Sequence, residues 1–187
     1  MFLVTGGCGF IGSNLVRLLL GAGYGVLNVD KLSYSGNLGS LSDLSHRDDY
    51  TFVQGDIADT PMISALLEKY KPGVIFNLAA ESHVDKSIDS PSEFVQTNLV
   101  GTFSVLEAAR RYWRNIPEDE KRAFKFIHVS TDEVYGSLLP DESPFTESTP
   151  YRPSSVYSAT KAGADHLAMA YHATYNLPVI VTNCSNN

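Results

Sequence analysis

The 187-residue chain has 14 basic and 21 acidic side chains, and its net charge of −7 at pH 7 excludes the basic surface that nucleic-acid binding requires. A hydrophobic content of 43% is typical of a globular core and too high for a disordered chain. Two cysteines, Cys8 and Cys184, are too few for a disulfide framework, and the apolar run at 15–20 is too short to span a membrane. We therefore expect a cytoplasmic protein that acts on a nucleotide-sized ligand, away from membranes and nucleic acids.

Short β-rich runs alternate with longer helical patterns along the chain. Apolar runs predict strands at residues 2–4, 25–30, 50–54, 74–79, 124–130 and 179–182. Apolar spacing, proline and glycine signals predict helices at residues 13–22, 60–70, 92–114 and 154–175. Strands separated by helices favour right-handed βαβ units, so the expected fold class is α/β, a doubly wound parallel sheet flanked by helices. Because the sequence stops just after a strand, we expect a single domain, 1–187, that is truncated at its C-terminal end.

A glycine-rich turn follows the first predicted strand and opens the first predicted helix. Gly6, Gly9 and Gly12 have the spacing of the dinucleotide fingerprint, in which glycines allow a tight turn, a close approach of the pyrophosphate and close helix–strand packing. The amino end of the helix then offers N–H groups to the phosphates. Asp30 ends the next strand, where a carboxylate accepts from an adenosine ribose hydroxyl and favours NAD over NADP, although the adjacent Lys31 weakens that preference.

One alternative to this interpretation stays open. The glycines can form a purely structural turn, with Asp30 and Asp56 as solvated acids. In the dinucleotide interpretation, the Asp56 carboxylate is instead placed to reach the adenine amino group. Cys8, inside the turn, is expected to be a small filler rather than a nucleophile, since no resolving cysteine lies nearby in the sequence.

Tyr157 and Lys161 are four residues apart on the last predicted helix and therefore share one face. Tyrosine is a poor base at its ordinary pKa of about 10, but a neighbouring ammonium stabilises the phenolate. The pair therefore indicates a tyrosine base assisted by a lysine. The alternative is an aromatic packing residue beside a solvated lysine.

Thr131, Asp132 and Glu133 directly follow the fifth predicted strand, where ligands bind in open α/β sheets. The environment can give two adjacent carboxyl groups different pKa values, so that one is a protonated acid and the other an ionised base. The alternative is a capped, solvated loop. His83 is either an acid, base or phosphate contact, or a residue that shapes its loop. The other histidines show no metal-ligand spacing, so we predict no metal site.

Five stretches in chain order carry a family resemblance: 5–12, 77–87, 130–136, 157–161 and 183–187. With them the sequence resembles the extended short-chain dehydrogenases/reductases, and within these the dTDP-glucose 4,6-dehydratase family. The Asp132–Glu133 pair before Val-Tyr-Gly resembles the residues that sugar-nucleotide dehydratases, rather than epimerases, carry at this place. Cys8 stands where alanine is more familiar in the family, and both residues are small.

The resemblance implies a Rossmann-type NAD-binding domain and a set of binding residues. In addition to Gly6, Gly9 and Gly12, the residues it implies around NAD are Phe10, Ile11, Asp30, Lys31, Leu32, Ser33, Asp56, Ile57, Leu78, Ala79, Ala80, Ser82, Thr97, Tyr157, Lys161 and Asn187. Those it implies at the sugar nucleotide are Ser82, Thr131 and Asn186. It also implies a missing C-terminal substrate domain and a homodimer formed through the two long helices.

The implied chemistry is a dehydration of dTDP-glucose with internally recycled NAD. Tyr157, assisted by Lys161 and Thr131, removes the C4 hydroxyl proton while hydride leaves C4. Glu133 then abstracts the C5 proton while Asp132 protonates the departing C6 hydroxyl, and hydride returns to C6. The alternatives are a sugar-nucleotide 4-epimerase, an NAD-binding redox sensor without chemistry, and a fragment that binds NAD without turnover.

Overall fold

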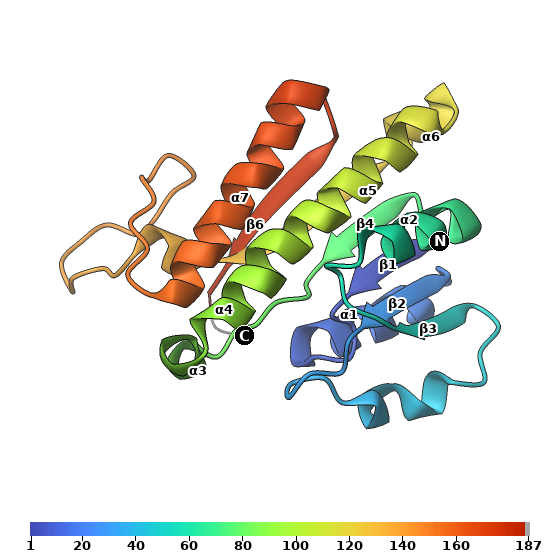
Figure 1. Cartoon of the computed structure of the whole chain (residues 1–187), viewed down its shortest axis with the longest axis horizontal. Coiled ribbons are helices and arrows are strands. Elements are labelled where there is room, and N and C mark those ends of the chain that lie inside the picture. Colours follow the sequence, from blue (N-terminus) through green and yellow to red (C-terminus); the bar gives the residue numbers. More distant parts are fainter. Residues whose placement is uncertain (186–187) are drawn as a thin grey trace.

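In the computed structural model, which describes residues 1–185, six parallel strands form one sheet in the order β3-β2-β1-β4-β5-β6 (Figure 1). The strands are β1 (Phe2–Thr5), β2 (Val26–Asp30), β3 (Tyr50–Gln54), β4 (Val74–Asn77), β5 (Lys125–Thr131) and β6 (Val179–Cys184). This order reverses direction between β1 and β4, which makes their carboxyl ends the switch point of a doubly wound sheet. The predicted Rossmann-type α/β class is therefore confirmed.

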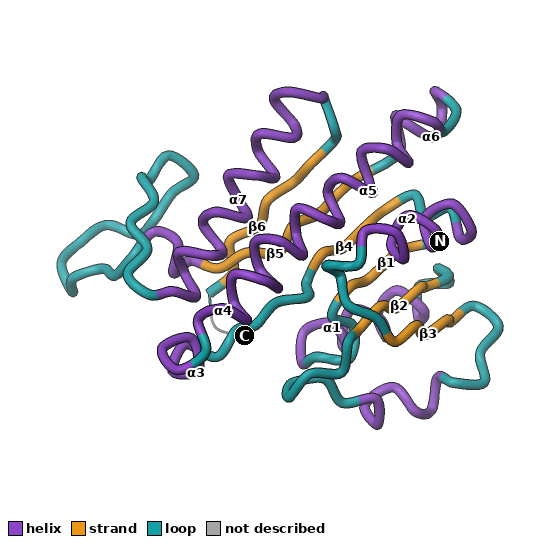
Figure 2. The backbone as a smooth tube through the Cα atoms, viewed as in Figure 1, coloured by secondary structure: helices purple, strands orange, loops and turns teal. Residues whose placement is uncertain are grey.

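Helices cover both faces of the sheet (Figure 2). They are α1 (Phe10–Gly21), α2 (Thr60–Tyr70), α3 (Val84–Asp89), α4 (Pro91–Phe94), α5 (Thr102–Asn115), α6 (Glu118–Ala123) and α7 (Val156–Tyr175). Successive residues of a strand point to opposite faces, so Leu3 joins the core beneath α2, α5 and α7, whereas Val4 joins the core beneath α1. No helix in the described part of the chain is long and apolar enough to cross a membrane.

Helix boundaries differ from the sequence predictions at two places that matter for the site. Helix α1 begins at Phe10 rather than residue 13, because Gly9 is extended and serves as the N-cap, which brings Gly12 into the first turn. The predicted helix at 92–114 is interrupted by a π-helical segment, Val95–Gly101, between α4 and α5. Apolar periodicity did not reveal this segment, because its buried and exposed residues still alternate at nearly helical spacing.

Several short elements were not predicted. Residues 84–89 form α3, and 3₁₀ turns occur at Leu38–Leu44 and Asp132–Tyr135. The polar connection after α5 contains α6, whose first turn carries three acidic residues at the positive end of the helix dipole. Strand β4 ends at Asn77, two residues before the predicted end, and β6 continues two residues further, to Cys184.

Candidate active site

A cavity of about 440 Å³ lies at the carboxyl ends of the central strands. Its walls come from the glycine turn, the ends of β2, β4, β5 and β6, the π-helical segment and the start of α7. The volume is within the range of cavities that bind cofactors and other small molecules. Residues far apart in the sequence therefore meet at the switch point of the sheet.

The glycine turn forms one end of this cavity, with no room for a side chain at Gly6 or Gly12. Gly6 has a positive φ of 70°, and a Cβ there would lie 2.7 Å from the backbone nitrogen of Ala79. A Cβ on Gly12 would overlap the carbonyl oxygen of Gly6, which accepts a hydrogen bond from the Gly9 amide at 3.2 Å. Among the described residues, no side chain caps the amino end of α1. Its N–H groups and dipole are therefore available to a phosphate.

The Asp30 carboxylate organises the loop around the predicted ribose site. One oxygen accepts from the Cys8 amide at 2.9 Å and the other from the Leu32 amide at 2.8 Å. Leu32 has a positive φ of 59°, and the hydrogen bond from its backbone N–H to Asp30 stabilises this unfavourable conformation. Asp30 lines the cavity while remaining almost buried, so its negative charge faces a ligand from a fixed position.

Lys31 is held by two residues that are distant from it in the sequence, Glu81 and Thr97. Its ammonium lies 3.3 Å from Oε1 of the buried Glu81 and donates to Thr97 Oγ1 at 2.9 Å. The carboxylate neutralises the cation beside the predicted ribose site. The tendency of Lys31 to attract the ribose 2′-phosphate of NADP is therefore smaller than the sequence alone suggests.

The π-helical segment fixes the loop that carries Glu81. Asn98 accepts from the Glu81 amide at 2.8 Å and donates to the Glu81 carbonyl at 2.9 Å. The same Asn98 amide group donates to Thr160 Oγ1 at 3.0 Å, which ties this segment to α7. π-Helical segments are frequent at functional sites, and here the segment places Thr97 in the cavity wall with Asn98 next to it in the chain.

Tyr157 and Lys161 lie on one face of α7 and both line the cavity. The capping box of Ser155 and Ser158 fixes the first turn of this helix just before the pair. Burial raises the pKa of Tyr157 to about 12, and the side-chain hydrogen bond with Thr131 partly opposes that rise. Burial also lowers the pKa of Lys161 to about 8, while its ammonium donates to the Val129 carbonyl at 2.7 Å.

Thr131, Asp132 and Glu133 all line the same cavity, directly after β5. Thr131 Oγ1 accepts from the Glu133 amide at 3.2 Å and so caps the 3₁₀ turn that carries the two acids. Burial raises the pKa of the Glu133 carboxyl, and the nearby Asp132 charge raises it further. This environment suits a carboxylate that takes up a proton during a reaction.

Most of the remaining predicted residues also line the cavity: Gly9, Phe10, Ile11, Ser33, Ile57, Leu78, Ala79, Ala80, Ser82 and Thr97. Two do not. Leu32 packs against the core beneath α1, and Asp56 accepts from the Ala58 amide at 2.9 Å beside the cavity. His83 is exposed, and its ring contacts that of Tyr34. Asn186 and Asn187 lie outside the described residues.

Sequence reasoning missed other residues in the lining: Val29, Ser35, Gly55, Val129, Ser130, Cys184 and Ser185. Val129, Ser130 and Cys184 are at or near the carboxyl ends of β5 and β6, so the rule for open sheets was sufficient to find them. Nothing in the sequence pattern singles out Ser35, which a loop brings to the cavity.

The sheet order, the glycine cradle and the Tyr157–Lys161 pair define a dinucleotide-binding domain of the extended short-chain dehydrogenase/reductase class. The chain belongs to the GDP-mannose 4,6 dehydratase family, whose sequence model matches residues 3–187.

Comparison with known proteins narrows the relationship. Over its whole length the chain is 53% identical to a dTDP-glucose 4,6-dehydratase of Xanthomonas campestris, and it spans 53% of that protein. It is similar to the structure of the Bacillus anthracis dTDP-glucose 4,6-dehydratase in complex with NAD, with 44% identity, a TM-score of 0.85, and coverage of 100% of this chain and 55% of that one. A UDP-glucose 4-epimerase from Brucella ovis is more distant, with 32% identity, a TM-score of 0.80, and coverage of 96% and 50%. The chain thus spans about half the length of these relatives.

Proposed function

We propose that this chain is the NAD-binding and catalytic part of a dTDP-glucose 4,6-dehydratase, which converts dTDP-glucose to dTDP-4-dehydro-6-deoxyglucose and water. The observation that carries the proposal is the convergence of two pairs in one cavity: Tyr157 with Lys161, and Asp132 with Glu133. The first pair suits removal of a hydroxyl proton, and the second suits the elimination of water that an epimerase does not perform. The identity to dehydratases, higher than to the epimerase, supports the same activity.

The cavity residues fit NAD by their chemistry. The side-chain-free cradle at Gly6 and Gly12 accommodates a pyrophosphate, and the fixed Asp30 carboxylate suits a ribose diol while repelling an additional phosphate. Phe10 and Ile11 are exposed at the amino end of α1 and line the cavity beside the glycine cradle. When bound there, NAD supplies a hydride acceptor that later returns the hydride.

The chain's own residues then move the protons. Tyr157 takes the proton of the C4 hydroxyl through its phenolic oxygen, and the Lys161 ammonium stabilises the phenolate. Thr131 forms a hydrogen bond with Tyr157 and orients the C4 hydroxyl of the sugar. Glu133 takes the C5 proton onto its carboxylate, and Asp132 delivers a proton to the leaving C6 hydroxyl. Ser82 contacts the sugar nucleotide, and Asn186 and Asn187, outside the described residues, are proposed to contact substrate and cofactor.

Mass spectrometry of dTDP-glucose, incubated with this chain and NAD, tests the proposal. Loss of one water is the expected result. A product of unchanged mass with inverted C4 stereochemistry would identify an epimerase instead. Unchanged substrate, together with NAD binding in calorimetry, would restrict this chain to cofactor binding and contradict the catalytic proposal.

We also infer that the chain forms a homodimer in the cytoplasm through α5 and α7, which lie side by side (Figure 1). Val100 in the π-helical segment, Phe103 on α5 and Met169 on α7 leave 37%, 44% and 45% of their surface exposed. Sedimentation should show twice the monomer mass. Replacement of Phe103 and Met169 by serine should give a monomer.

A further inference from the structure

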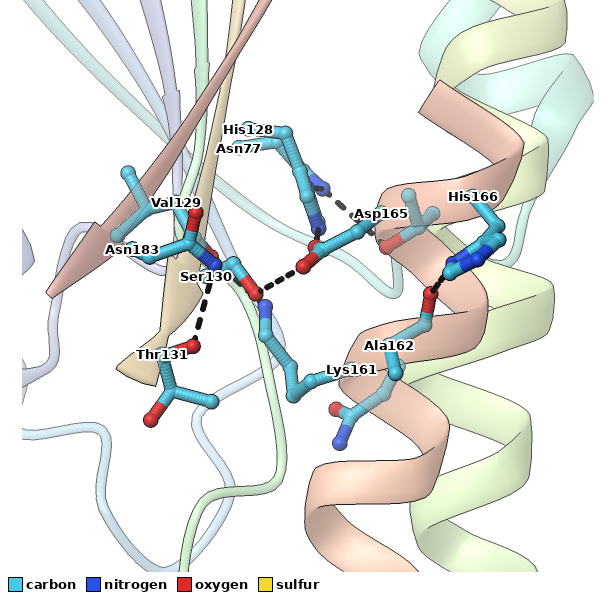
Figure 3. Close-up of polar contacts among 12 residues, drawn as sticks. Asn77, His128, Val129, Ser130, Thr131, Lys161, Ala162, Asp165, His166 and Asn183 are labelled. Carbon is cyan, nitrogen blue, oxygen red and sulfur yellow. Dashed lines mark hydrogen bonds and ion pairs between the residues drawn. The ribbon is translucent and has the colours of Figure 1, made fainter. Parts of the chain in front are cut away.

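We propose that Asp165, which no part of the proposed chemistry uses, is a positioning residue that holds the Lys161 ammonium charged and in place; this inference rests on the proposed role of Lys161 beside Tyr157. Asp165 is one turn after Lys161 on α7, and the two residues are 0% and 4% exposed. Figure 3 shows both side chains directed from α7 toward β5. A buried charge is stable only with a compensating charge or hydrogen bonds, which makes this juxtaposition informative.

Strand β5 ties the two side chains together. Lys161 donates to the Val129 carbonyl at 2.7 Å, and the next residue, Ser130, donates through Oγ to Asp165 Oδ2 at 2.8 Å. The hydroxyl of Tyr151 donates to the same Asp165 oxygen at 3.0 Å. Adjacent residues of one strand therefore fix the positions of the ammonium and the carboxylate. A displacement of Asp165 would disturb the floor of the cavity through Ser130 and Val129.

The hydrogen-bond partners of Asp165 are arranged for an ionised carboxylate. Nδ2 of Asn77, which is a donor, lies 3.2 Å from Nδ1 of His128, so the neutral ring carries its proton on Nε2. That nitrogen lies 3.2 Å from Asp165 Oδ1 (Figure 3). Ser130 and Tyr151 thus both donate hydrogens to Asp165 Oδ2, whereas Oδ1 and His128 Nε2 lie close together without a hydrogen bond. A protonated acid would instead need an acceptor for its own hydrogen.

His128 cannot supply the positive charge that this carboxylate needs. Burial lowers the pKa of His128 to about 4, and the nearby Lys161 charge lowers it further. Lys161 is the cation that remains. Its pKa is lowered by burial and raised by the Asp165 charge. The groups that face Lys161 and its partner are Asp165 and Tyr157 on α7, His128 on β5, Cys184 on β6 and Tyr151 in the preceding loop.

The experiment is a pH titration of the lysine side chains by NMR, with ¹³C at the ε position. The chain has seven lysines, and the Lys161 resonance is identified by its loss in Lys161→Met. We expect the Lys161 midpoint near 8 in the unaltered chain. In Asp165→Asn it should fall by about one pH unit, the effect of removing one buried opposite charge a helical turn away. An unchanged or raised midpoint in a folded Asp165→Asn chain would overturn the proposal.

Tyr151→Phe is the matched control, because it removes a hydrogen bond to the same carboxylate without removing the charge. Its Lys161 midpoint should stay at the wild-type value even if its stability falls. A fall as large as in Asp165→Asn would show that loosened packing, not charge, moves the midpoint. The unaltered chain gives a second test that needs no folded variant. The ¹³Cγ resonance of Asp165 should change its chemical shift at the Lys161 midpoint. If no such change occurs, the proposed interaction between the two charges is contradicted. Neither readout depends on turnover or NAD binding, so the proposed function can fail separately.

Discussion

The Lys31 ammonium lies 3.3 Å from the Glu81 carboxylate, a pairing between the end of β2 and the loop after β4. The glutamate is buried, and its main chain is held by Asn98, which accepts from the Glu81 amide and donates to the Glu81 carbonyl. The cation beside the predicted adenosine ribose is therefore already neutralised before any ligand enters. We therefore expect Glu81 to influence the choice between NAD and NADP, although the residue itself is distant in sequence from the glycine turn.

Glu81→Gln should weaken the discrimination against NADP. With its counter-charge removed, Lys31 becomes free to attract a 2′-phosphate, while Asp30 continues to repel it. We expect the ratio of the dissociation constants of NADP and NAD to fall about five-fold, the scale of one partly exposed charge interaction. Calorimetric titration with each cofactor measures the ratio. Glu68→Gln, an exposed carboxylate on α2, is the control and should leave it unchanged. An unaltered ratio in Glu81→Gln would contradict the assignment.

Gly12→Ala should destabilise the domain and abolish tight NAD binding. The added Cβ would overlap the Gly6 carbonyl oxygen, which is backbone and cannot move aside cheaply. We expect the free energy of unfolding to fall by about 2 kcal/mol or more, as for other clashes with backbone. Urea denaturation measures this change. Gly21→Ala, in the same helix and with open space around it, should instead stabilise by about 0.5–1 kcal/mol. Equal effects at both positions would exclude the clash as the cause.

Glu107 should make stability depend on pH in the acid range. Hydrogen bonds from Arg110 lower the pKa of Glu107 from 4.5 to about 2, with further help from Arg111 and Tyr171. Because the folded-state pKa is the lower one, the stabilisation is present above about 4.5 and is lost as the pH falls toward 2. Glu107→Gln should therefore cost about 1 kcal/mol at neutral pH after allowance for solvent screening. Denaturation curves at several pH values should show that the difference in free energy of unfolding between the variant and the unaltered chain vanishes near pH 2. A difference independent of pH would contradict this origin.

Glu133→Gln should separate the two halves of the proposed reaction. The amide cannot take the C5 proton, whereas Tyr157 and Lys161 remain intact for the first proton transfer. On addition of dTDP-glucose, absorbance of reduced nicotinamide should therefore accumulate, and release of dehydrated product should slow by about 10²–10⁴-fold. Tyr157→Phe, which removes the phenolic oxygen of the first step, should show neither signal. Product formation at the wild-type rate in Glu133→Gln would exclude Glu133 as the base.

The parts of the site that depend on local sequence were predictable. The spacing of Gly6, Gly9 and Gly12 after a strand requires a tight turn, and the four-residue separation of Tyr157 and Lys161 puts them on one helix face. Both features depend on local backbone geometry, which the neighbouring residues determine. The alternation of strands and helices similarly determined the class of fold.

The contacts between distant segments were not predictable in the same way. The approach of Glu81 to Lys31 and that of His128 to Asp165 span 50 and 37 residues, and neither residue type nor spacing signals them. They arise only once the sheet order brings the carboxyl ends of β2, β4 and β5 to the same edge of the sheet, with β1 between β2 and β4. Periodicity also misses the π-helical segment, because one wider turn changes the apolar pattern too little.

The π-helical segment makes the number of residues in this helix, and not only their identity, part of the site. Removal of one exposed residue such as Gln96 would allow the segment to return to regular α-helical geometry, which changes the directions of its side chains relative to α5. Thr97 and Asn98 would then no longer face Lys31 and Glu81 together with Thr160. Natural variants of this domain should accordingly vary in composition on the outer side of the segment while keeping its length constant.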